Sequence, residues 1–383
     1  MRTVCVVITA RPSYSRIKTA LLAIREHPAL KLQLVVAASA LLDRYGNAKG
    51  VIENDGFEIS AKVHSVVEGE DYISMVKTTG LGIIELATVF DNLRPDVVVS
   101  VADRYETLAT AVAASYMNIP LVHIQGGEVT GSIDEKVRHS ITKLADLHLV
   151  STATAATRVV KMGEVASRVI VTGCPSIDIA DEVLRTGTQD IEFLQSYGGV
   201  GYLGDVGKEF LVVLQHPVTT EASLARAQIT QTLEAIDEIG LPTLWFWPNV
   251  DAGADGCSKG IRAFRESGKG KRIRFLKNME PLDFLRLLVQ SKMIIGNSSV
   301  AIRECSYLGV PAINVGSRQR GRERGKNVID VGYCKSEIVN AFRVHSGGSR
   351  GGTDCLYGDG KAGLRVAEAI HKFIPTTEKQ LTY

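Results

Sequence analysis

Apolar residues along the chain fall into short runs that alternate with segments of helical spacing. In the first half these runs are Val4–Ile8, Leu32–Ala37, Val97–Val101, Leu121–Ile124 and Val169–Thr172. Between the first two runs, the segment Arg16–His27 places Ile17, Leu21 and Ile24 on one helical face. Continuous apolar runs are typical of buried parallel strands, and strands separated by helices indicate βαβ units. The first half therefore predicts a doubly wound parallel sheet.

The alternation stops at a glycine-rich stretch, residues 198–207, and then begins again. This stretch is the predicted linker or loop. The strands predicted after it are Phe210–Leu214, Leu244–Trp247, Arg272–Leu276, Met293–Ile295 and Ala312–Val315. At roughly 100–200 residues per domain, a chain of 383 residues predicts two domains. The predicted fold class is therefore α/β, with two Rossmann-like, doubly wound domains that face a cleft.

The same pattern sets the expected domain boundaries. We expect an N-terminal domain over residues 1–178 and a C-terminal domain over residues 205–360. A C-terminal helix within residues 361–383, with its clearest periodicity over Ala362–Phe373, is expected to pack back on the N-terminal domain.

Composition and charge narrow the functional classes. Lys and Arg number 44 against 42 Asp and Glu, so the net charge of +2 excludes a strongly basic nucleic-acid binder. The basic loop 318–326 is isolated in a near-neutral chain and does not change that conclusion. The sequence contains no run of 18 uncharged apolar residues, and the apolar start Thr3–Thr9 is too short for a signal peptide. We therefore expect no contact with a membrane.

The cysteines and histidines point away from disulfides and metals. The six cysteines form no CxxC pair and stand mostly beside apolar residues, which predicts reduced, buried thiols in a cytoplasmic protein. The eight histidines are not clustered as metal ligands are, and His139 and His148 are interpreted as packing or surface residues. No metal and no other cofactor is predicted.

Polar residues follow the predicted strands, and the carboxyl ends of parallel strands are where ligands of open α/β sheets bind. In the first half these residues are Arg11, Ser15, Asp103, Arg104, Gln125 and Glu128. In the second half they are His216, Asn249, Asp251, Ser298, Ser299 and Arg318. The mixture of cations, hydroxyls and carboxylates predicts a site for a polar, phosphorylated ligand.

Gly296-Asn-Ser-Ser299 opens a predicted helix over Val300–Leu308. Free N–H groups at a helix N-terminus suit a phosphate, and the two hydroxyls add donors. The alternative is that Asn297 or Ser298 is simply the helix cap. The cations at neighbouring strand ends favour the phosphate site.

Asp103, Glu128 and Asp134 fall close to predicted strand ends. Two carboxylates on opposite sides of a carbon atom can remove a proton and return one, as general acid–base chemistry requires. The structural alternatives are that Asp103 begins its helix and that Ser132-Ile-Asp-Glu135 is a capping box, with Asp134 as a first-turn anion.

Eight motifs lie in order along the chain. They are Asp103-Arg-Tyr-Glu-Thr-Leu, His123-Ile-Gln-Gly-Gly-Glu-Val-Thr-Gly-Ser-Ile-Asp-Glu, Arg138-His139, Ile141-Thr-Lys-Leu, Gly173-Cys-Pro-Ser176, His216-Pro-Val-Thr-Thr, Trp247-Pro-Asn-Val-Asp-Ala-Gly253 and Gly296-Asn-Ser-Ser299. Together they resemble those of a known family, the hydrolysing UDP-N-acetylglucosamine 2-epimerases of sialic-acid and related pathways. The resemblance runs from Arg11 to about Asp330.

The resemblance implies a GT-B-type fold of two domains, with the sugar and catalytic carboxylates on the N-terminal domain and the nucleotide on the C-terminal domain. It implies conversion of UDP-N-acetylglucosamine, or a close amino-sugar analogue, and water to an N-acetylmannosamine-type sugar and UDP. UDP leaves as the C2 proton is removed, water adds to the glycal-like intermediate at C1, and C2 is reprotonated on its other face. It also implies a homo-oligomer, dimer or tetramer, and a small-molecule partner.

The resemblance assigns roles residue by residue. Asp103 and Asp134 match carboxylates of the proton transfer, and His216 matches a histidine near the diphosphate. Ser298, Ser299 and Arg318 match phosphate contacts. Glu304 matches a carboxylate that binds the ribose, and Arg11 and Asn249 match other positions on the nucleotide side. These donors would carry the leaving-group charge without a metal.

Two positions depart from the family pattern. Residue 125 is Gln where the family carries Glu, and an amide does not accept and return a proton at neutral pH. Three explanations are open. Glu128 transfers the proton in place of residue 125, or Asp103 and Asp134 suffice for the proton transfer while Gln125 binds the sugar, or the protein is inactive. We favour the second explanation. Asp255 stands near a position where some members have a lysine beside the base, which leaves the identity of the nucleotide base open.

A catalytically silent nucleotide-sugar-binding protein and a non-hydrolysing epimerase are the alternatives to the hydrolysing epimerase.

Overall fold

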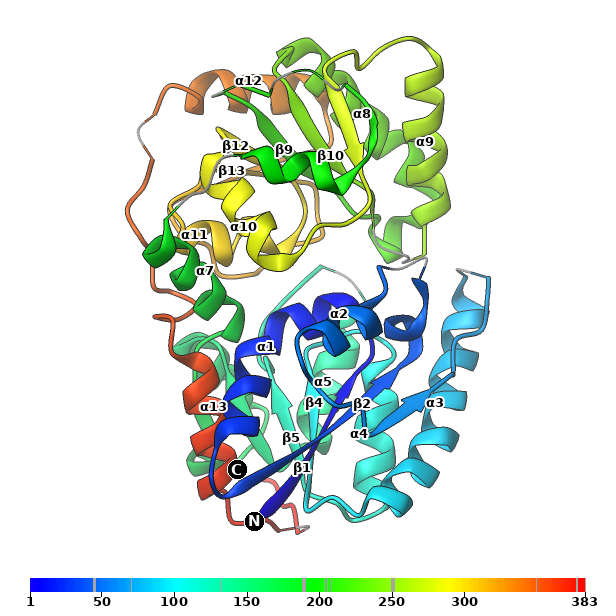
Figure 1. Ribbon diagram of the computed structural model, residues 1–383, viewed down its shortest axis with the longest axis vertical. Helices are drawn as coiled ribbons and strands as arrows, with labels where there is room; N and C mark the ends of the chain where they lie inside the picture. The colour runs from blue at the N-terminus through cyan, green and yellow to red at the C-terminus, as the bar shows by residue number, and fades with distance from the viewer. Residues whose placement is uncertain are drawn as a thin grey trace. The chain divides into compact units, whose positions relative to one another are not determined.

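The structure is a computed structural model that describes residues 1–382 except 44, 45, 70, 132, 188–190, 203, 205, 208, 249–251, 349 and 377. It divides into two compact units. Unit 1 consists of Met1–Glu128, Ile133–Asp178 and Tyr357–Tyr383, and unit 2 of Val129–Ser132 and Ile179–Leu356. Both units are α/β (Figure 1), which confirms the predicted class of fold.

Unit 1 contains a parallel sheet with the strand order β3-β2-β1-β4-β5-β6-β7. Its strands are β1 (Arg2–Ile8), β2 (Leu30–Ala37), β3 (Ala61–Val63), β4 (Val97–Val101), β5 (Leu121–Ile124), β6 (Leu147–Val150) and β7 (Val169–Val171). Its helices are α1 (Arg11–Glu26), α2 (Ala48–Asn54), α3 (Tyr72–Leu93), α4 (Thr107–Tyr116), α5 (Asp134–Leu144), α6 (Ala153–Lys161) and α13 (Ala362–Lys372), with 3-10 turns at Ala38–Leu41 and Ala166–Arg168.

The central strand β1 shows why helices cover both faces of this sheet. Val4, Val6 and Ile8 belong to a core packed under α1 and α13, whereas Cys5 and Val7 belong to a second core under α3, α4 and α5. Side chains alternate between the faces of a strand, so an uninterrupted apolar run needs an apolar partner on each side.

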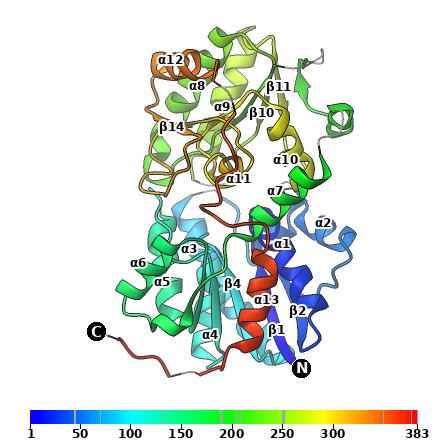
Figure 2. The ribbon, with the colours of Figure 1, turned by 90° about the vertical axis from the view of Figure 1, so that its left-hand side faces the viewer.

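The C-terminal helix α13 packs against α1 (Figures 1 and 2), with its N-terminus held by a carboxylate from α7 (Pro175–Thr186). Asp178 accepts hydrogen bonds from the backbone N–H groups of Ala362 and Gly363, at 2.8 and 2.7 Å. Helix α13 ends at Lys372, one residue before the end of the periodicity over Ala362–Phe373, and the rest of the segment to residue 383 is not helical where it is described. Pro375 follows closely, and proline disfavours the helical conformation of the residue before it.

Unit 2 contains the second sheet, with the strand order β14-β13-β12-β9-β10-β11-β8. Its strands are β8 (Val200–Gly201), β9 (Leu211–Leu214), β10 (Thr243–Phe246), β11 (Ile273–Leu276), β12 (Met293–Gly296), β13 (Ala312–Val315) and β14 (Val328–Val331). Its helices are α8 (Ala225–Ile239), α9 (Ala254–Glu266), α10 (Pro281–Gln290), α11 (Glu304–Tyr307) and α12 (Lys335–His345), with 3-10 turns at Ile191–Tyr197, Thr219–Leu224 and Ser299–Ala301.

The glycine-rich stretch 198–207, predicted to be a linker or a loop, lies within unit 2 and does not link the units. The chain passes from unit 1 to unit 2 within α7. The stretch contains β8, which pairs antiparallel with β11. Gly201 has a φ of +106°, and a Cβ there would lie 2.4 Å from the Ile273 carbonyl oxygen. The glycines therefore permit a close strand contact and do not mark a domain boundary.

The remaining differences from the sequence expectations are local. Strands β3, β6, β8 and β14 were not predicted, since each is short and has a weak apolar signal on its own. Cys334 and Cys355 are exposed, whereas Cys5, Cys174, Cys257 and Cys305 are buried as expected.

Helix α3 is, by length and composition, apolar enough to cross a membrane. Its buried residues Ser74, Thr78, Gly82, Leu86 and Phe90 recur every four positions, and the helix packs against α4 and β3. This periodicity is typical of an amphipathic helix that covers a sheet.

A buried carboxylate joins β6, α5 and the C-terminal segment of unit 1. Glu164 accepts hydrogen bonds from Lys143 Nζ at 2.6 Å and from His148 Nε2 at 2.9 Å, and lies 2.7 Å from Lys379 Nζ. Burial opposes the charge of Glu164, but these three partners together lower its pKa from 4.5 to about 2. The ionised form of Glu164 is therefore the form that stabilises the fold.

We predict that Glu164→Gln makes the fold less dependent on pH. Because the folded pKa lies below the unfolded value of 4.5, Glu164 stabilises the protein above pH 4.5, and this stabilisation is lost as the pH falls towards about 2. At pH 7 the variant should lose about 2 kcal/mol of unfolding free energy. Urea unfolding at pH 7 and pH 3 should show that difference shrinking in acid.

Glu58→Gln, at an exposed position of the same unit, is the matched control and should leave the pH dependence unchanged. A constant difference between wild type and Glu164→Gln at both pH values would contradict the assignment.

Candidate active site

In unit 1 the predicted site residues follow three neighbouring strands. Arg11 follows β1, Asp103 follows β4 and Gln125 follows β5, and these strands lie side by side in the sheet. The chain order reverses between β1 and β4, so this edge is the topological switch point where α/β sheets bind ligands.

The backbone before Asp103 is held in an unusual conformation. Ala102 has a φ of +62°, its N–H donates to the Ile124 carbonyl at 2.9 Å, and its carbonyl accepts from His123 Nε2 at 2.9 Å. A positive φ is rare for a residue with a Cβ and persists only where neighbouring contacts enforce it. Helix α4 begins only at Thr107, so Asp103 is not the start of that helix, and the structural alternative for this residue is excluded.

His123 is a neutral structural residue. It is fully buried, and this burial together with the nearby positive groups lowers its pKa to about 3. At neutral pH the imidazole therefore donates its Nε2 proton to the Ala102 carbonyl and carries no charge.

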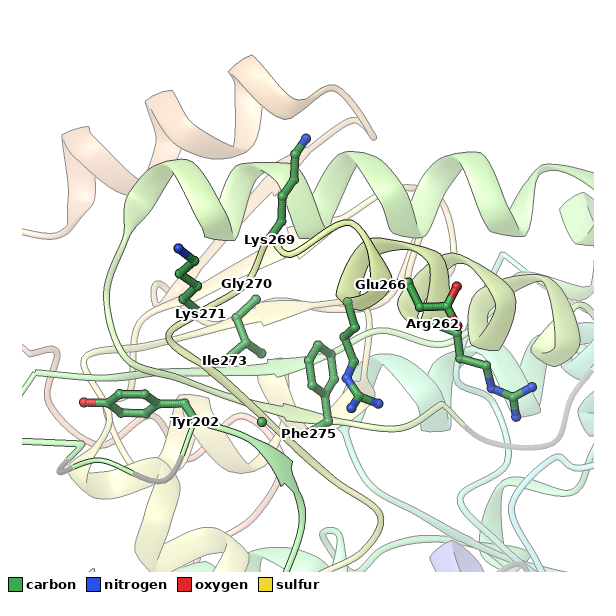
Figure 3. Close-up of a pocket in the computed structure, with 10 residues that line it drawn as sticks. Tyr202, Arg262, Glu266, Lys269, Gly270, Lys271, Ile273 and Phe275 are labelled. Atoms are coloured by element: carbon green, nitrogen blue, oxygen red, sulfur yellow. The ribbon is translucent and has the colours of Figure 1, made fainter.

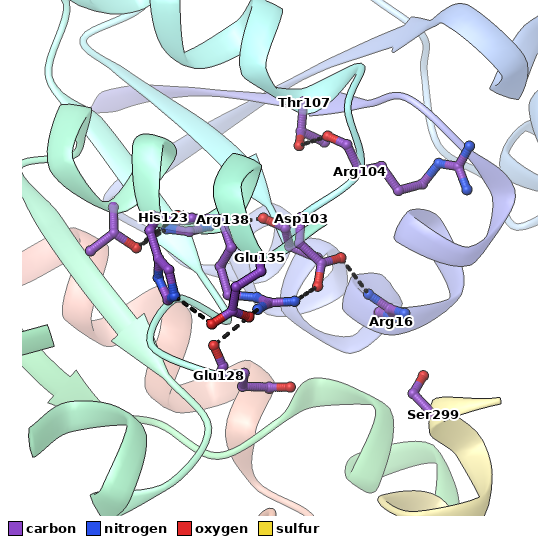
Figure 4. A network of polar contacts seen from close by, with 12 residues as sticks. Arg16, Asp103, Arg104, Thr107, His123, Glu128, Glu135, Arg138 and Ser299 are labelled. Atoms are coloured by element: carbon purple, nitrogen blue, oxygen red, sulfur yellow. Dashed lines mark hydrogen bonds and ion pairs between the residues drawn. The ribbon is translucent and has the colours of Figure 1, made fainter. Parts of the chain in front are cut away.

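The Asp103 carboxylate is bound by a buried arginine that the sequence analysis did not assign a role. Arg138 is fully buried on α5, and its Nη2 donates to Asp103 Oδ2 (Figure 4). Its Nη1 donates to the Glu128 carbonyl at 2.9 Å and to Glu135 Oε2 at 2.8 Å. One guanidinium thus connects the ends of β4 and β5 with the first turn of α5.

A second arginine lies near the same carboxylate, because Arg16 Nη1 is 3.8 Å from Asp103 Oδ1. Burial opposes the charge on Arg138, yet the charges of Asp103, Glu128 and Glu135 raise its pKa above the usual value. Opposite charges at this distance favour the ionised form of each group. Two arginines therefore place positive charge beside the buried Asp103 carboxylate.

A signal for Arg138 was present in the sequence. It stands between the buried residues Val137 and Ile141 on the apolar side of α5, three positions after Glu135. A charged side chain on a buried helix face needs a partner of opposite charge. The sequence of the helix does not show which strand end supplies that partner.

The other two carboxylates occupy different environments. Glu128 is 4% exposed, whereas Asp134 is half-buried at the first position of α5, where its charge also suits the helix dipole. Of the predicted capping box, Glu135 binds Arg138 and His139 Nε2 with its side chain. Ser132 lies outside the described residues.

Gln125 is the most constrained residue of the group. It is 2% exposed, has a φ of +68°, and donates through Nε2 to Cys174 Sγ at 2.9 Å. Within the described part of the chain its buried Oε1 accepts no hydrogen bond. An unfilled acceptor at a strand end can receive an N–H or O–H group of a ligand.

The remaining site residues of unit 1 already have partners. Arg11 Nη1 donates to the Gly46 carbonyl at 2.7 Å, and Ser15 Oγ donates to the Arg11 carbonyl at 3.2 Å. Arg104 binds Glu106 with two nitrogens, each at 3.1 Å, and lies over the ring of Tyr105. A ligand that uses these arginines must share them with these partners.

In unit 2, Asn297 fixes the geometry of the corresponding edge. Its Oδ1 accepts from the His216 N–H at 2.7 Å and its Nδ2 donates to the His216 carbonyl at 2.8 Å. His216 follows β9 and Asn297 follows β12; the two strands are neighbours, and the chain order reverses between them. The fully buried asparagine therefore clamps the switch point of this sheet and sets the position of His216.

The expected helix Val300–Leu308 is wrong. The chain forms a 3-10 turn at Ser299–Ala301 and then the short helix α11. Ser298 caps the turn, and Arg303 Nη2 donates to Ser299 Oγ at 2.9 Å. The dipole of so short a helix is small, so any affinity for an anion here must come from side chains and individual N–H groups.

Glu304 has an unusual environment for a carboxylate. It is 6% exposed, lies 3.9 Å from Arg303 Nε, and its buried Oε2 forms no hydrogen bond with the described residues. A buried oxygen of this kind suits the hydroxyl groups of a ligand.

Arg318 lies at the end of β13, the neighbour of β12. Its Nη1 is 3.3 Å from the Asn297 carbonyl, and its own carbonyl accepts from the Gly131 N–H at 3.1 Å. Asn249 and Asp251, which the sequence analysis also placed in the site, lie outside the described residues.

A separate cavity of about 500 Å³ lies in unit 2, lined by β8, β11 and the end of α9. Figure 3 shows that the charged ends of Lys269, Lys271 and Arg262 point in different directions. These groups do not converge on one ligand, so this cavity is not the candidate site. Among the described residues, no cluster of three or more His, Cys, Asp or Glu is placed to hold a metal ion.

Comparisons with known proteins agree with this architecture. The family model described as UDP-N-acetylglucosamine 2-epimerase matches residues 22–371. The UDP-N,N'-diacetylbacillosamine 2-epimerase (hydrolyzing) of Legionella pneumophila is 31% identical over 98% of this chain and 97% of its own. The polysialic acid biosynthesis protein P7 of Escherichia coli is 32% identical over 90% of this chain and 86% of its own.

Among solved structures, the UDP-GlcNAc 2-epimerase of Neisseria meningitidis bound to UDP-GlcNAc has a TM-score of 0.81 at 19% identity, covering 97% of this chain and 100% of its own. That likeness supports the fold. Because the family model covers most of the chain and two relatives exceed 30% identity along it, this protein belongs to the UDP-N-acetylglucosamine 2-epimerase family.

Proposed function

We propose that this protein is a hydrolysing nucleotide-sugar 2-epimerase that converts a UDP-linked 2-acetamido sugar and water to the free 2-epimer and UDP. The observation that carries the proposal is the buried Asp103 carboxylate at the switch point of unit 1, which binds Arg138 and lies near Arg16. The Legionella relative aligns along almost the whole chain, and its name specifies a hydrolysing enzyme. This favours a hydrolysing reaction over an epimerisation without hydrolysis.

In the proposed reaction, a carboxylate of unit 1 accepts the C2 proton while the C1–O bond to UDP breaks, and the electron pair leaves with the diphosphate. The product of this elimination is a glycal-like intermediate. Water then adds at C1, and a second acid delivers a proton to the other face of C2. Asp103 and Asp134 are the proposed pair, with Glu128 as the substitute.

Gln125 has a binding role in this proposal. Its amide neither accepts nor returns a proton at neutral pH, but its buried Oε1 is an acceptor without a hydrogen bond in the described chain. We assign it to a hydrogen bond with the sugar. This leaves the proton transfer to the carboxylates and accounts for the replacement of the family glutamate.

We propose that unit 2 binds the nucleotide. His216 and Arg318 supply positive charge or hydrogen-bond donors to the diphosphate as negative charge develops on it, and Ser298 and Ser299 add hydroxyl donors. The unfilled Oε2 of Glu304 fits the hydroxyls of a ribose. Arg11 and Ser15 of unit 1, together with Asn249 and Asp251, complete the proposed set, and no metal is required.

The reaction itself is tested by proton NMR of the purified protein in heavy water, with UDP-N-acetylglucosamine and UDP-N,N'-diacetylbacillosamine offered separately. We expect free UDP and a free 2-epimerised sugar that carries deuterium at C2. A UDP-linked epimer would identify a non-hydrolysing enzyme, and a product without deuterium would exclude the elimination. Calorimetric binding without turnover would identify a silent binding protein.

We predict that Asp103→Asn lowers kcat by at least about 10³-fold, because an amide does not accept the C2 proton. The UDP affinity of this variant should stay within about twofold, since the nucleotide residues are unchanged. Ser298→Ala should show the opposite pattern, with KM raised and kcat nearly preserved, because it removes only a donor to the phosphate. Steady-state kinetics and UDP titration separate the two patterns. An Asp103→Asn protein with the full rate would remove Asp103 from the mechanism.

We predict that Arg138 is a positioning residue that keeps Asp103 ionised. A lysine has a single charged nitrogen and does not reproduce the contacts of Arg138 with Asp103, Glu128 and Glu135. Arg138→Lys should lower kcat about 10–100-fold and move the acid limb of the pH–rate profile to higher pH, since Asp103 then lies in a buried site with a weaker partner.

Lys136→Met, at an exposed position on the same helix, is the control and should leave the profile in place. A lower rate with an unchanged acid limb would mean that Arg138 is needed only for folding and not for the charge state of Asp103.

A further inference from the structure

A buried cysteine lies against the side chain that we assign to the sugar. Gln125 follows β5 and Cys174 follows β7, and these two strands flank β6 in the sheet of unit 1. Gln125 Nε2 donates to Cys174 Sγ at 2.9 Å, and neither residue is more than 2% exposed. This contact crosses the end of β6 and joins two strand ends that are far apart in the chain. The proposed reaction gives Cys174 no role.

The backbone around Cys174 holds its sulfur in place. The Cys174 N–H donates to the Tyr357 carbonyl at 2.7 Å, and the Cys174 carbonyl accepts from the Ile177 N–H at 2.9 Å. Gly173 has a φ of +82°, and a Cβ there would lie 3.2 Å from the Gly358 Cα. Glycine adopts such a backbone without strain and permits the close approach. The segment that returns to unit 1 at Tyr357 therefore fixes the position of Cys174.

The backbone of Gln125 is fixed as well, so only its side chain has a choice of orientation. The Gln125 N–H donates to the Leu149 carbonyl at 2.9 Å, and the residue has a φ of +68°. From this position the amide can turn either its oxygen or its nitrogen towards a ligand. The two orientations differ in chemistry, because the oxygen only accepts hydrogen bonds and the nitrogen only donates them.

The contact with Cys174 determines which end of the amide is left for a ligand. The Cys174 sulfur accepts from Gln125 Nε2, and Ser176 Oγ lies 3.0 Å from the same sulfur, where it can accept the thiol proton. The nitrogen of Gln125 is thus engaged by the sulfur. Its buried Oε1 accepts no hydrogen bond from the residues that the structure describes.

We propose that Cys174 is a positioning residue that orients the Gln125 amide, so that Oε1 accepts a hydrogen bond from a hydroxyl or amide N–H of the sugar. This inference rests on the sugar-binding role proposed for Gln125, and it adds that the group of the sugar at this point is a donor. A carboxylate at position 125 would have two equivalent acceptor oxygens. A glutamine has one acceptor and one donor end, so its function depends on a partner that orients it.

The first measurement is NMR of the full-length protein without ligand, with glutamine labelled at its side-chain nitrogen. The Gln125 amide signal is the one that is missing from Gln125→Met. Cys174→Ala should shift this signal, because the N–H loses its acceptor. Cys174→Ser should restore the signal towards its wild-type position, because a hydroxyl also accepts and donates. Cys5→Ala removes an equally buried thiol from β1 and is the control, which should leave the signal unchanged.

The second measurement is calorimetric binding of UDP-N-acetylglucosamine and of UDP, with Asp103→Asn in every protein so that the sugar nucleotide is not consumed. Cys174→Ala should weaken the binding of UDP-N-acetylglucosamine about 10-fold, because the Gln125 acceptor is no longer held towards the sugar. The affinity for UDP should stay within about twofold. Cys174→Ser should recover most of the loss. In Gln125→Met, the further change Cys174→Ala should have no effect, because the amide that Cys174 orients is absent.

Four results would overturn the proposal. These are a Gln125 signal that does not move in Cys174→Ala, a Cys174→Ser protein that behaves as Cys174→Ala does, losses of affinity that add in the double variant, and equal losses for UDP and UDP-N-acetylglucosamine. Failure of the proposed function has a different signature. A wild-type protein that releases no free UDP from the sugar nucleotide would refute the reaction, while the NMR measurement would still decide the role of Cys174.

Discussion

The buried ion pair between Asp103 and Arg138 is the contact on which the candidate chemistry depends. A carboxylate that is 8% exposed is stable in its charged form only if another charge compensates for the lost water, and Arg138 supplies that charge. Removing one partner of such a pair leaves an uncompensated buried charge, at a cost of ~3–5 kcal/mol. The same guanidinium binds the Glu128 carbonyl and Glu135, so one side chain fixes both the charge and the position of the group.

In both units, a buried polar side chain fixes the residues that follow the strands at the switch point. In unit 1, Arg138 joins the ends of β4 and β5, and His123 holds the strained Ala102 through its carbonyl. In unit 2, the side chain of Asn297 makes both of its bonds to the backbone of His216. In each case a rigid contact fixes the residue that follows a strand, so the loops at the edge of the sheet need not be rigid themselves. Family membership fits this design, because the family motifs coincide with these strand ends.

The structure changes the interpretation of one sequence motif. The segment Gly296–Ser299 was predicted to be the N-terminus of a helix, but the chain there forms a 3-10 turn followed by a four-residue helix. A donor to an anion at this position is therefore an individual hydroxyl or N–H group, and not the end of a long helix dipole.

The sequence alone determined the order of most strands and helices, because strands buried on both faces need continuous apolar runs and the helices between them need apolar stripes. It also located Asp103, Gln125, His216 and the other strand-end residues, since these positions follow from where each run stops. It did not show that Arg138 binds Asp103, that Gln125 has a positive φ, or that the chain changes units inside α7. Those facts depend on contacts between segments far apart in the chain, and neither hydrophobic periodicity nor local motif spacing contains the information about which side chains meet.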